Sequence, residues 1–252
     1  MPPQSSPQPS RLPVPPSSRR PSRRRSYDQY CAAARALDAV GDRWTLLIVR
    51  ELLAGPRRYT DLHADLPGVS TDMLASRLKD MERDDLATRR KLPPPASAYV
   101  YELTARGRGL LPVLRALAQW GGAALEAPEP TDAVRAHWFA VPLLTALEAA
   151  GEPGLVEVVL DEGTFHVRVG EAAVGSASGH RGATAQDDRP VYGEGALLDR
   201  VEVDARLSMD AATCVAVGRG DLSIEEGVKA GRIDVAGQGP LAAALRGESA
   251  SA

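Results

Sequence analysis

Apolar and polar positions alternate with helical spacing along the first half of the chain. Apolar side chains recur at that spacing over residues 31–40, 44–52 and 57–66. The letters PGVS separate the third run from a further helix, which begins within VSTDMLASRLKDMERDDLATRRK (residues 69–91). Two short helices joined by a tight turn predict a helix-turn-helix, whose second helix enters the major groove of DNA.

The helix that begins near Ser70 has one apolar and one polar face. Leu74, Leu78 and Met81 lie at i, i+4 and i+7, on the face that a core would cover. Ser70 stands at the N-cap position, where its hydroxyl can accept a hydrogen bond from a free backbone N–H. Taken alone, this pattern is typical of a half-buried surface helix with a solvated polar side.

The periodicity changes after this helix. LATRRKL and AYVYELT alternate like strands and are joined by PPPAS, which predicts a β-hairpin. A hairpin that follows a helix-turn-helix is a wing. The next stretch, ARGRGLLPVLRALAQWGGAAL, predicts one long amphipathic helix with Pro112 in its first turn.

The second half predicts an α+β domain after the acidic, proline-rich linker EAPEPTD. In order, its segments are a helix over 131–150, strands at 155–160, 164–169 and 172–177, a mobile loop over 178–195, a strand within 199–210, and then helix, helix, strand and helix. Because the strands come first and the helices gather at the end, the pattern favours an α+β arrangement.

The composition indicates the broad class of protein. The 252 residues are 44% hydrophobic, enough for one large or two modest domains, and no apolar run is long enough to span a bilayer, so we expect no membrane partner. The two cysteines, Cys31 and Cys214, form no CxxC pair, which favours a reducing compartment, the cytoplasm.

The net charge of −3 conceals an asymmetry. Residues 1–26 carry +6 from arginines alone, residues 27–125 carry +2, and residues 126–252 carry −11. The first segment is rich in Pro, Ser and Arg and is expected to be disordered, either as a non-specific phosphate contact or as an inert tail. A basic half beside an acidic half indicates a nucleic-acid-binding domain joined to something else.

No catalytic or metal-binding motif is present. The sequence has no GxSxG, no Walker A motif, no Rossmann glycine set and no HExxH pair. Catalysis in the second half would have to depend on His166 or His180, with nothing nearby in sequence to orient them. We therefore expect no enzyme, no cofactor and no metal site.

The segments GDRWTLLIVRELL, GPRRYTDL, LPGVS, LASRLKDME and YELTARG, following Cys31, resemble HxlR-type winged-helix transcription regulators over roughly residues 27–125. A weaker resemblance, in DAAT, GDLS and GRIDVAG, is to the C-terminal part of sterol-carrier-protein-like domains, in which a sheet and helices enclose an apolar tunnel. Together they predict a disordered tail at 1–26, a winged helix-turn-helix domain with dimerisation helices at 27–125, a linker at 126–130, a sterol-carrier-protein-like α+β domain at 131–247 and a short tail at 248–252.

The first resemblance implies that STDMLASRLKDM is the recognition helix on double-stranded DNA. Short polar side chains allow close approach to the groove, Asp can accept from cytosine and Arg pairs with guanine. We expect the bases to be nearest Thr71, Asp72, Ser76 and Arg77, although Arg77 flanks the apolar face and a structural or phosphate contact remains open. The other expected DNA contacts are Arg57 and Arg58 as backbone anchors, Ser70, Lys79 on phosphate, and the wing cations Arg89, Arg90 and Lys91.

Three hypotheses remain open. In the first, the chain is a homodimeric regulator on an inverted-repeat operator, with the first helix and the helix at 106–125 at the dimer interface. In the second, Cys31 is a thiol sensor, against the alternative of a small buried residue. In the third, the C-terminal domain binds a hydrophobic small molecule, either to modulate DNA affinity or as a carrier with secondary DNA binding. The residues proposed to line that site, with ordinary core packing as the alternative, are Trp138, Phe139, Leu143, Leu144 and Phe165.

Overall fold

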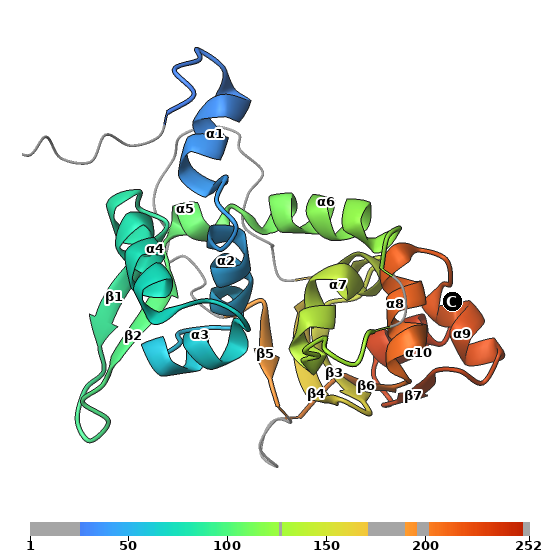
Figure 1. The fold of residues 1–252 in the computed structure, drawn as a ribbon. Coiled ribbons are helices and arrows are strands. Elements are labelled where there is room, and N and C mark those ends of the chain that lie inside the picture. The colour runs from blue at the N-terminus through green and yellow to red at the C-terminus, as the bar shows by residue number, and fades with distance from the viewer. Residues whose placement is uncertain (1–25, 126–127, 171–189, 196–201, 249–252) are drawn as a thin grey trace, which may run out of the picture. The chain divides into compact units, whose positions relative to one another are not determined.

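The computed structural model describes residues 26–125, 128–170, 190–195 and 202–248 (Figure 1). Contacts divide the chain into two compact units, which meet in sequence after Gly41. The predicted N-terminal and C-terminal tails, apart from residues 26 and 248, and the predicted strand at 172–177 lie outside the described residues.

The first unit contains helix α1 (Ala32–Val40), which confirms the first helical prediction. The stretch before the helix folds back on it, because Asp38 accepts hydrogen bonds from the Ser26 hydroxyl (3.1 Å) and the Tyr27 backbone N–H (2.9 Å). These bonds lower the pKa of Asp38, with the backbone N–H of Tyr27 as the main cause.

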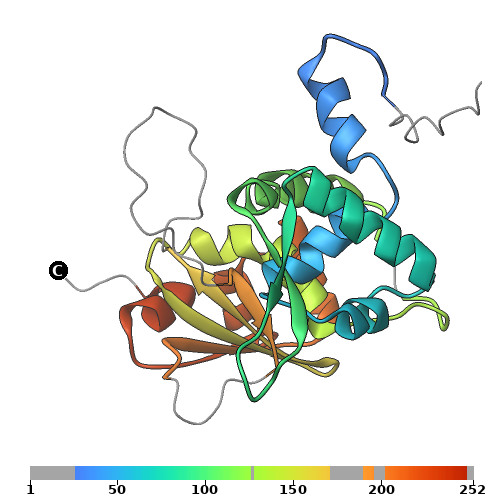
Figure 2. The same ribbon diagram turned by 90° about the vertical axis from the view of Figure 1, so that its left-hand side faces the viewer.

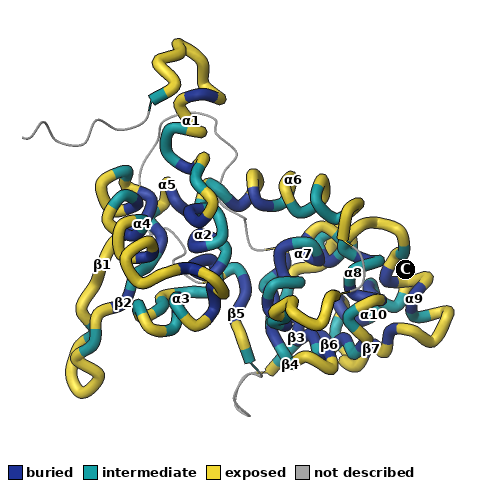
Figure 3. Tube along the Cα trace, viewed as in Figure 1, coloured by how far each residue is buried: buried dark blue, intermediate teal, exposed yellow. Residues whose placement is uncertain are grey.

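The second unit begins with the predicted helix-turn-helix and wing. Its elements are α2 (Thr45–Leu53), α3 (Tyr59–Asp65), α4 (Thr71–Arg83), β1 (Ala87–Lys91) and β2 (Tyr99–Leu103). The strands pair antiparallel from Ala87 opposite Leu103 to Lys91 opposite Tyr99, and the hairpin is a twisted ribbon (Figure 2). The predicted apolar face of α4 is buried against the rest of this unit, as Figure 3 shows.

The prediction of one long helix after the wing is wrong. Two helices form instead, α5 (Ala105–Arg108) and α6 (Leu111–Gly122). Thr104 caps the first through a hydrogen bond that its hydroxyl accepts from the Gly107 N–H (3.1 Å), and Gly109 ends it. Pro112 lies in the first turn of α6 as expected, where its missing N–H costs nothing.

The helix expected over 131–150 is shorter and begins with a different turn. A 3₁₀ turn (Ala136–Phe139) leads into α7 (Ala140–Glu148). Strands β3 (Gly154–Leu160) and β4 (Gly163–Val169) follow as predicted, and β6 (Ala205–Ser208) occupies part of the stretch expected to hold the later strand. The final predicted series is also confirmed, as α8 (Ala211–Arg219), α9 (Ile224–Lys229), β7 (Asp234–Ala236) and α10 (Pro240–Leu245).

A five-stranded mixed sheet organises this region, in the order β5-β4-β3-β6-β7. β3 and β6 run parallel and the other neighbours are antiparallel. Its core includes the fully buried Val156, Val158, Phe165 and Val167. The architecture is α+β, as expected, and the likeness to sterol-carrier proteins stays a prediction.

Strand β5 (Tyr192–Glu194) corrects the prediction of a mobile loop over 178–195 for its last residues; residues 178–189 lie outside the described part. Tyr192 is fully buried, and its hydroxyl donates to the Arg50 carbonyl. Gly193 stands opposite His166, whose ring lies where a Cβ on Gly193 would be, so a side chain at this position would require the ring to move. Burial lowers the pKa of His166. His180 lies outside the described residues.

Within the described ranges, no helix has the length and apolar character needed to cross a membrane.

Candidate nucleic-acid interface

Helix α4 presents the polar surface that the sequence predicted. The Ser70 hydroxyl accepts from the Met73 N–H (3.3 Å) and so caps the helix. Leu74, Leu78 and Met81 are buried. This packing leaves the opposite side exposed, and the exposed residues there include Ser70, Thr71, Asp72, Ser76 and Lys79.

The turn between α3 and α4 is fixed by a side chain from the first of these helices. The hydroxyl of Tyr59, at the start of α3, donates to the Thr71 carbonyl at the start of α4 over 2.7 Å. Because α3 and α4 are joined at their N-terminal ends, Thr71 and Asp72 keep a defined position relative to α3. A recognition helix needs this kind of fixed support to place its side chains on base edges.

Arg77 is held by two carboxylates. Its guanidinium pairs with Asp42 (3.5 Å) and with Asp80 one turn on (2.8 Å), and its side chain is 26% exposed. Arg77 therefore joins α4 to the segment before α2. This geometry favours the structural alternative kept open for Arg77.

The three cations of the wing lie in three different environments. Arg90 donates from Nε and Nη2 to Glu102 across the hairpin at 2.9–3.0 Å. The guanidinium carbon of Arg89 lies 4.0 Å from the centre of the Tyr99 ring, a cation–π contact. Lys91, at the end of β1, is exposed.

The two arginines before α3 also differ. Arg57 pairs with Glu194 of β5 (2.9 Å) and with Asp65 (3.8 Å), and its side chain is 17% exposed. Arg58 is exposed at the N-cap position of α3. Of the two, Arg58 is thus the better placed for a phosphate backbone.

Cys31 stands at the N-cap position of α1 and is exposed. The nearby backbone N–H groups of Ala34 and Ala33 at the start of the helix lower the pKa of its thiol. Cys214, in contrast, is buried in α8, and burial raises its pKa to about 12. Only Cys31 combines access with a stabilised thiolate.

The residues proposed to line an apolar ligand site lie in two settings. Leu143, Leu144 and Phe165 are fully buried core residues. The Trp138 indole N–H donates to Glu51 (3.0 Å), and the guanidinium carbon of Arg50 lies 4.3 Å from the centre of its ring. Two cavities, of about 550 and 250 Å³, have none of the five proposed residues in their walls.

A buried polar cluster, which the sequence pattern did not predict, joins α2 to the C-terminal region. Glu51 accepts from the His137 ring (2.7 Å), from Trp138 and from Arg50 (2.8 Å). Although burial raises the pKa of Glu51, the His137 hydrogen bond and the positive charge of Arg50 outweigh it and hold that pKa below its ordinary value. One signal was available, because Glu51 falls on the apolar side of IVRELL, where a carboxylate needs partners.

Helix α6 exposes an apolar face. Val113, Leu117 and Trp120 lie at i, i+4 and i+7, and Trp120 is 82% exposed. Exposed apolar side chains gathered on one helix face are typical of a surface that binds another protein.

Among the described residues, no group of three or more His, Cys, Asp or Glu side chains is placed to hold a metal ion.

Comparison with known proteins assigns the winged-helix region. Residues 39–129 match the family model of the HxlR-like helix-turn-helix. Two HTH-type transcriptional regulators of Bacillus subtilis (strain 168) are similar: YvaP is 35% identical over 86 residues (34% of this chain, 80% of YvaP), and YodB is 34% identical over 99 residues (39% of this chain, 86% of YodB). The structure of YodB in its reduced form aligns with 40% of this chain and all of YodB, at 30% identity and a TM-score of 0.35. The chain belongs to the HxlR-like helix-turn-helix family of transcriptional regulators.

Proposed function

We propose that the protein is a cytoplasmic homodimer that regulates transcription by binding an inverted-repeat operator through α4 and the wing. One observation carries the proposal: the polar face of α4, with Thr71, Asp72 and Ser76, is exposed, and the start of this helix is joined to α3 by the Tyr59–Thr71 hydrogen bond. These short side chains reach base edges, while Lys79 contacts phosphate.

The cations around α4 supply non-specific affinity. Arg58 and Lys91 are exposed, and Arg89 and Arg90 lie on the exposed surface of the wing. Contacts of this kind to phosphate release counterions, so binding weakens steeply as salt rises. Arg57 and Arg77 act indirectly in this proposal, by holding α3 and α4 through their carboxylate partners.

The apolar face of α6 and the first helix form the dimer interface in this proposal. Burying Val113, Leu117 and Trp120 against a second copy removes apolar area that is exposed in the single chain. A two-fold dimer places two recognition helices about one turn of DNA apart, ~34 Å. The predicted operator is therefore an inverted repeat with that half-site spacing.

The test is binding of the full-length protein to its own upstream intergenic DNA, measured by fluorescence anisotropy across a salt series with scrambled DNA as competitor. Specific binding with a steep salt dependence supports the proposal. Binding that scrambled DNA abolishes at equal concentration contradicts it.

A second candidate function is favoured by Cys31. Its exposed thiol at the start of α1, with a lowered pKa, has the properties of an oxidant-sensitive cysteine. In this proposal, oxidation of Cys31 changes the affinity for DNA. Diamide should then alter operator binding by the wild-type protein and leave Cys31→Ser unchanged, with Cys214→Ser as the control that still responds. Equal responses of wild type and Cys31→Ser would remove the sensor.

A further inference from the structure

Met73 is an exposed apolar side chain on a helix whose other long apolar side chains are buried. Leu74, Leu78 and Met81 of α4 are at most 1% exposed, whereas Met73 is 43% exposed. Residues three apart lie on the same face of a helix, so Met73 stands beside the exposed Ser76. An apolar side chain therefore forms part of the surface that is proposed to face DNA.

The backbone of Met73 is held in the first turn of α4. Its N–H donates to the Ser70 hydroxyl (3.3 Å), and the neighbouring Thr71 carbonyl accepts from the Tyr59 hydroxyl (2.7 Å). In helix-turn-helix proteins, the N-terminal residues of the recognition helix are those that contact base edges. The methionine side chain is unbranched and has three rotatable bonds, so its end can reach further than the short side chain of Ser76.

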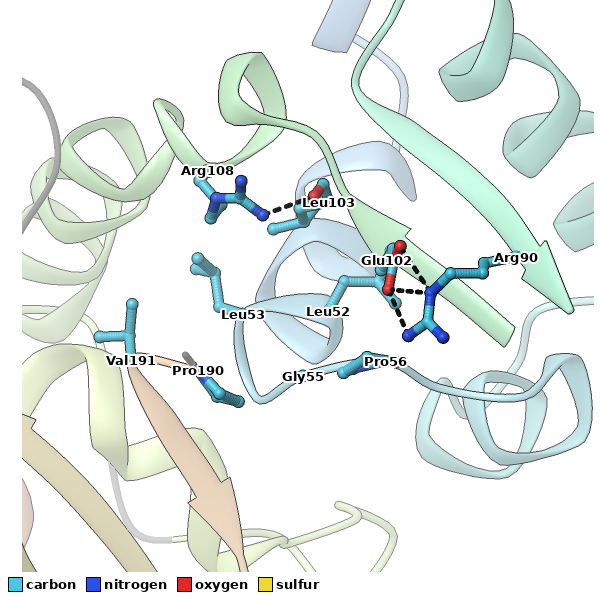
Figure 4. A pocket seen from close by; sticks show the side chains of 10 residues that line it. All are labelled: Leu52, Leu53, Gly55, Pro56, Arg90, Glu102, Leu103, Arg108, Pro190 and Val191. Carbon is cyan, nitrogen blue, oxygen red and sulfur yellow. Dashed lines mark hydrogen bonds and ion pairs between the residues drawn. The ribbon is translucent and has the colours of Figure 1, made fainter. Parts of the chain in front are cut away.

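The arginines of α4 and one arginine of the wing already have acidic partners. Both arginines of α4 pair with Asp80, Arg77 at 2.8 Å and Arg83 at 2.7 Å. On the wing, Arg90 donates hydrogen bonds of 2.9–3.0 Å to Glu102, as Figure 4 shows. Contact of any of these arginines with guanine would first require its ion pair to open. Discrimination between base pairs therefore depends on the other exposed side chains in the first turns of α4.

The thymine methyl is the group in the major groove that suits an apolar side chain. Of the four bases, only thymine carries a methyl on that edge. Contact with it removes apolar area of Met73 from water, whereas a polar base edge against Met73 would lose water without gaining a hydrogen bond. We propose that, in the complex of the proposed function, on which this inference rests, Met73 contacts one thymine methyl in each half-site and makes T·A the favoured base pair there.

Deoxyuridine tests this contact, because it lacks the thymine methyl and otherwise pairs with adenine in the same way. Each thymine of the operator is replaced singly by deoxyuridine, and binding of the full-length protein is measured by fluorescence anisotropy. At one position in each half-site, loss of the methyl should raise the Kd of the wild type about fourfold, the effect of burying one methyl group. Equal affinity for the unmodified operator and every substituted operator would overturn the proposal.

Variants assign the methyl contact to a residue. In Met73→Ala, deoxyuridine at that position should no longer change the Kd, and Met73→Leu, which keeps an apolar side chain of similar size, should recover the effect. Both changes are at an exposed position and keep the N–H that donates to Ser70, so α4 should remain folded. Thr71→Ser removes a neighbouring exposed methyl and is the matched control that should keep the fourfold effect. Persistence of the effect in Met73→Ala would overturn the proposal, and its loss in Thr71→Ser would then assign the contact to Thr71.

Failure of the methyl contact and failure of the proposed function give different results. Binding of the wild type to the unmodified operator, with scrambled DNA as competitor, is measured in the same titrations. Specific binding that depends on no thymine methyl would overturn the role of Met73 and leave the DNA-binding function in place. Binding without specificity would overturn both, because no operator is then recognised.

Discussion

His137 donates a hydrogen bond from Nε2 to Oε2 of Glu51 over 2.7 Å, and both side chains are buried. The two residues are 86 positions apart, one on α2 and the other in the 3₁₀ turn that opens the C-terminal region. Trp138 and Arg50 complete the set of donors around the carboxylate. Helix α2 and the 3₁₀ turn before α7 therefore share a polar contact that is buried from water.

Replacement of Glu51 by Gln should destabilise the protein strongly. It removes the negative charge that His137 and Arg50 face, and loss of one member of a buried ion pair typically costs about 3–5 kcal/mol. Urea unfolding of full-length wild type and Glu51→Gln measures the difference. Glu82→Gln, on an exposed face of α4, is the matched control and should change the free energy of unfolding by less than about 0.5 kcal/mol. Similar values for both variants would show that the cluster contributes little.

The contribution of Glu51 should depend on pH with a defined sign. Its pKa is lower in the folded protein than the ordinary value near 4.3 in the unfolded chain, so the ionised form favours folding. The stabilisation is therefore complete above about pH 4.3 and is lost as the pH falls through the folded pKa. The difference between wild type and Glu51→Gln should shrink accordingly in urea titrations at successively lower pH. A difference that stays constant to pH 3 would contradict the lowered pKa.

Asp65 should behave in the opposite way. Burial raises its pKa, and the nearby carboxylates of Glu51 and Glu194 raise it further, although Arg57 and Arg135 are within ion-pair distance. It also ends α3, where a negative charge meets the negative end of the helix dipole. An acid with a raised folded pKa costs stability at neutral pH, and that cost disappears as the pH falls.

Asp65→Asn should therefore raise the Tm at pH 7 slightly, and the gain should diminish at acidic pH. Thermal unfolding at pH 7 and pH 4 measures this difference in Tm, with Asp61→Asn on the same helix as the control. A lower Tm for Asp65→Asn at pH 7 would mean that its pairs with Arg57 and Arg135 outweigh the cost of burial.

The winged helix could be predicted from sequence because its signals are local. Ser70 caps α4 three residues before Met73, and the apolar positions of α4 repeat within two turns. The C-terminal contacts could not be predicted in this way, since they join residues that are far apart. Glu51 meets His137, and Arg50 meets Tyr192, through the tertiary fold alone.

Strand β5 was not predicted for the same reason, because it depends on contacts between residues that are far apart in the sequence. β5 is three residues long and contains a glycine, which local propensity assigns to a loop. It is a strand because it pairs with β4 and because Tyr192 is buried. Similarly, the place of Arg77 on α4 is compatible with a base contact, a phosphate contact or a structural contact, and its pairing with Asp42 depends on the position of a residue outside α4.

The two cysteines should differ in reactivity with an alkylating reagent. The lowered pKa of Cys31 increases its thiolate fraction at neutral pH, whereas burial raises the pKa of Cys214 to about 12 and excludes reagent. Limited treatment of the folded protein with iodoacetamide, followed by peptide mass spectrometry, should find Cys31 modified first. Unfolding in urea should make the rates similar. Faster modification of Cys214 in the folded state would contradict the structure.

Variants of Lys79 and Arg77 should distinguish binding of phosphate from stabilisation of α4. Lys79 is exposed on α4, so Lys79→Ala should leave one phosphate per chain without its cation and make the slope of log K against log salt shallower by about 0.9 for each such phosphate. Arg77→Ala removes the partner of Asp42 and Asp80, and should lower the free energy of unfolding while leaving the salt slope and the base preference nearly unchanged. Anisotropy salt series on the operator and on single-base variants, with urea unfolding of each protein, measure all three quantities. If Arg77→Ala instead relaxes discrimination at one base pair, by about 1–3 kcal/mol, Arg77 leaves its carboxylate partners on binding and reads guanine directly.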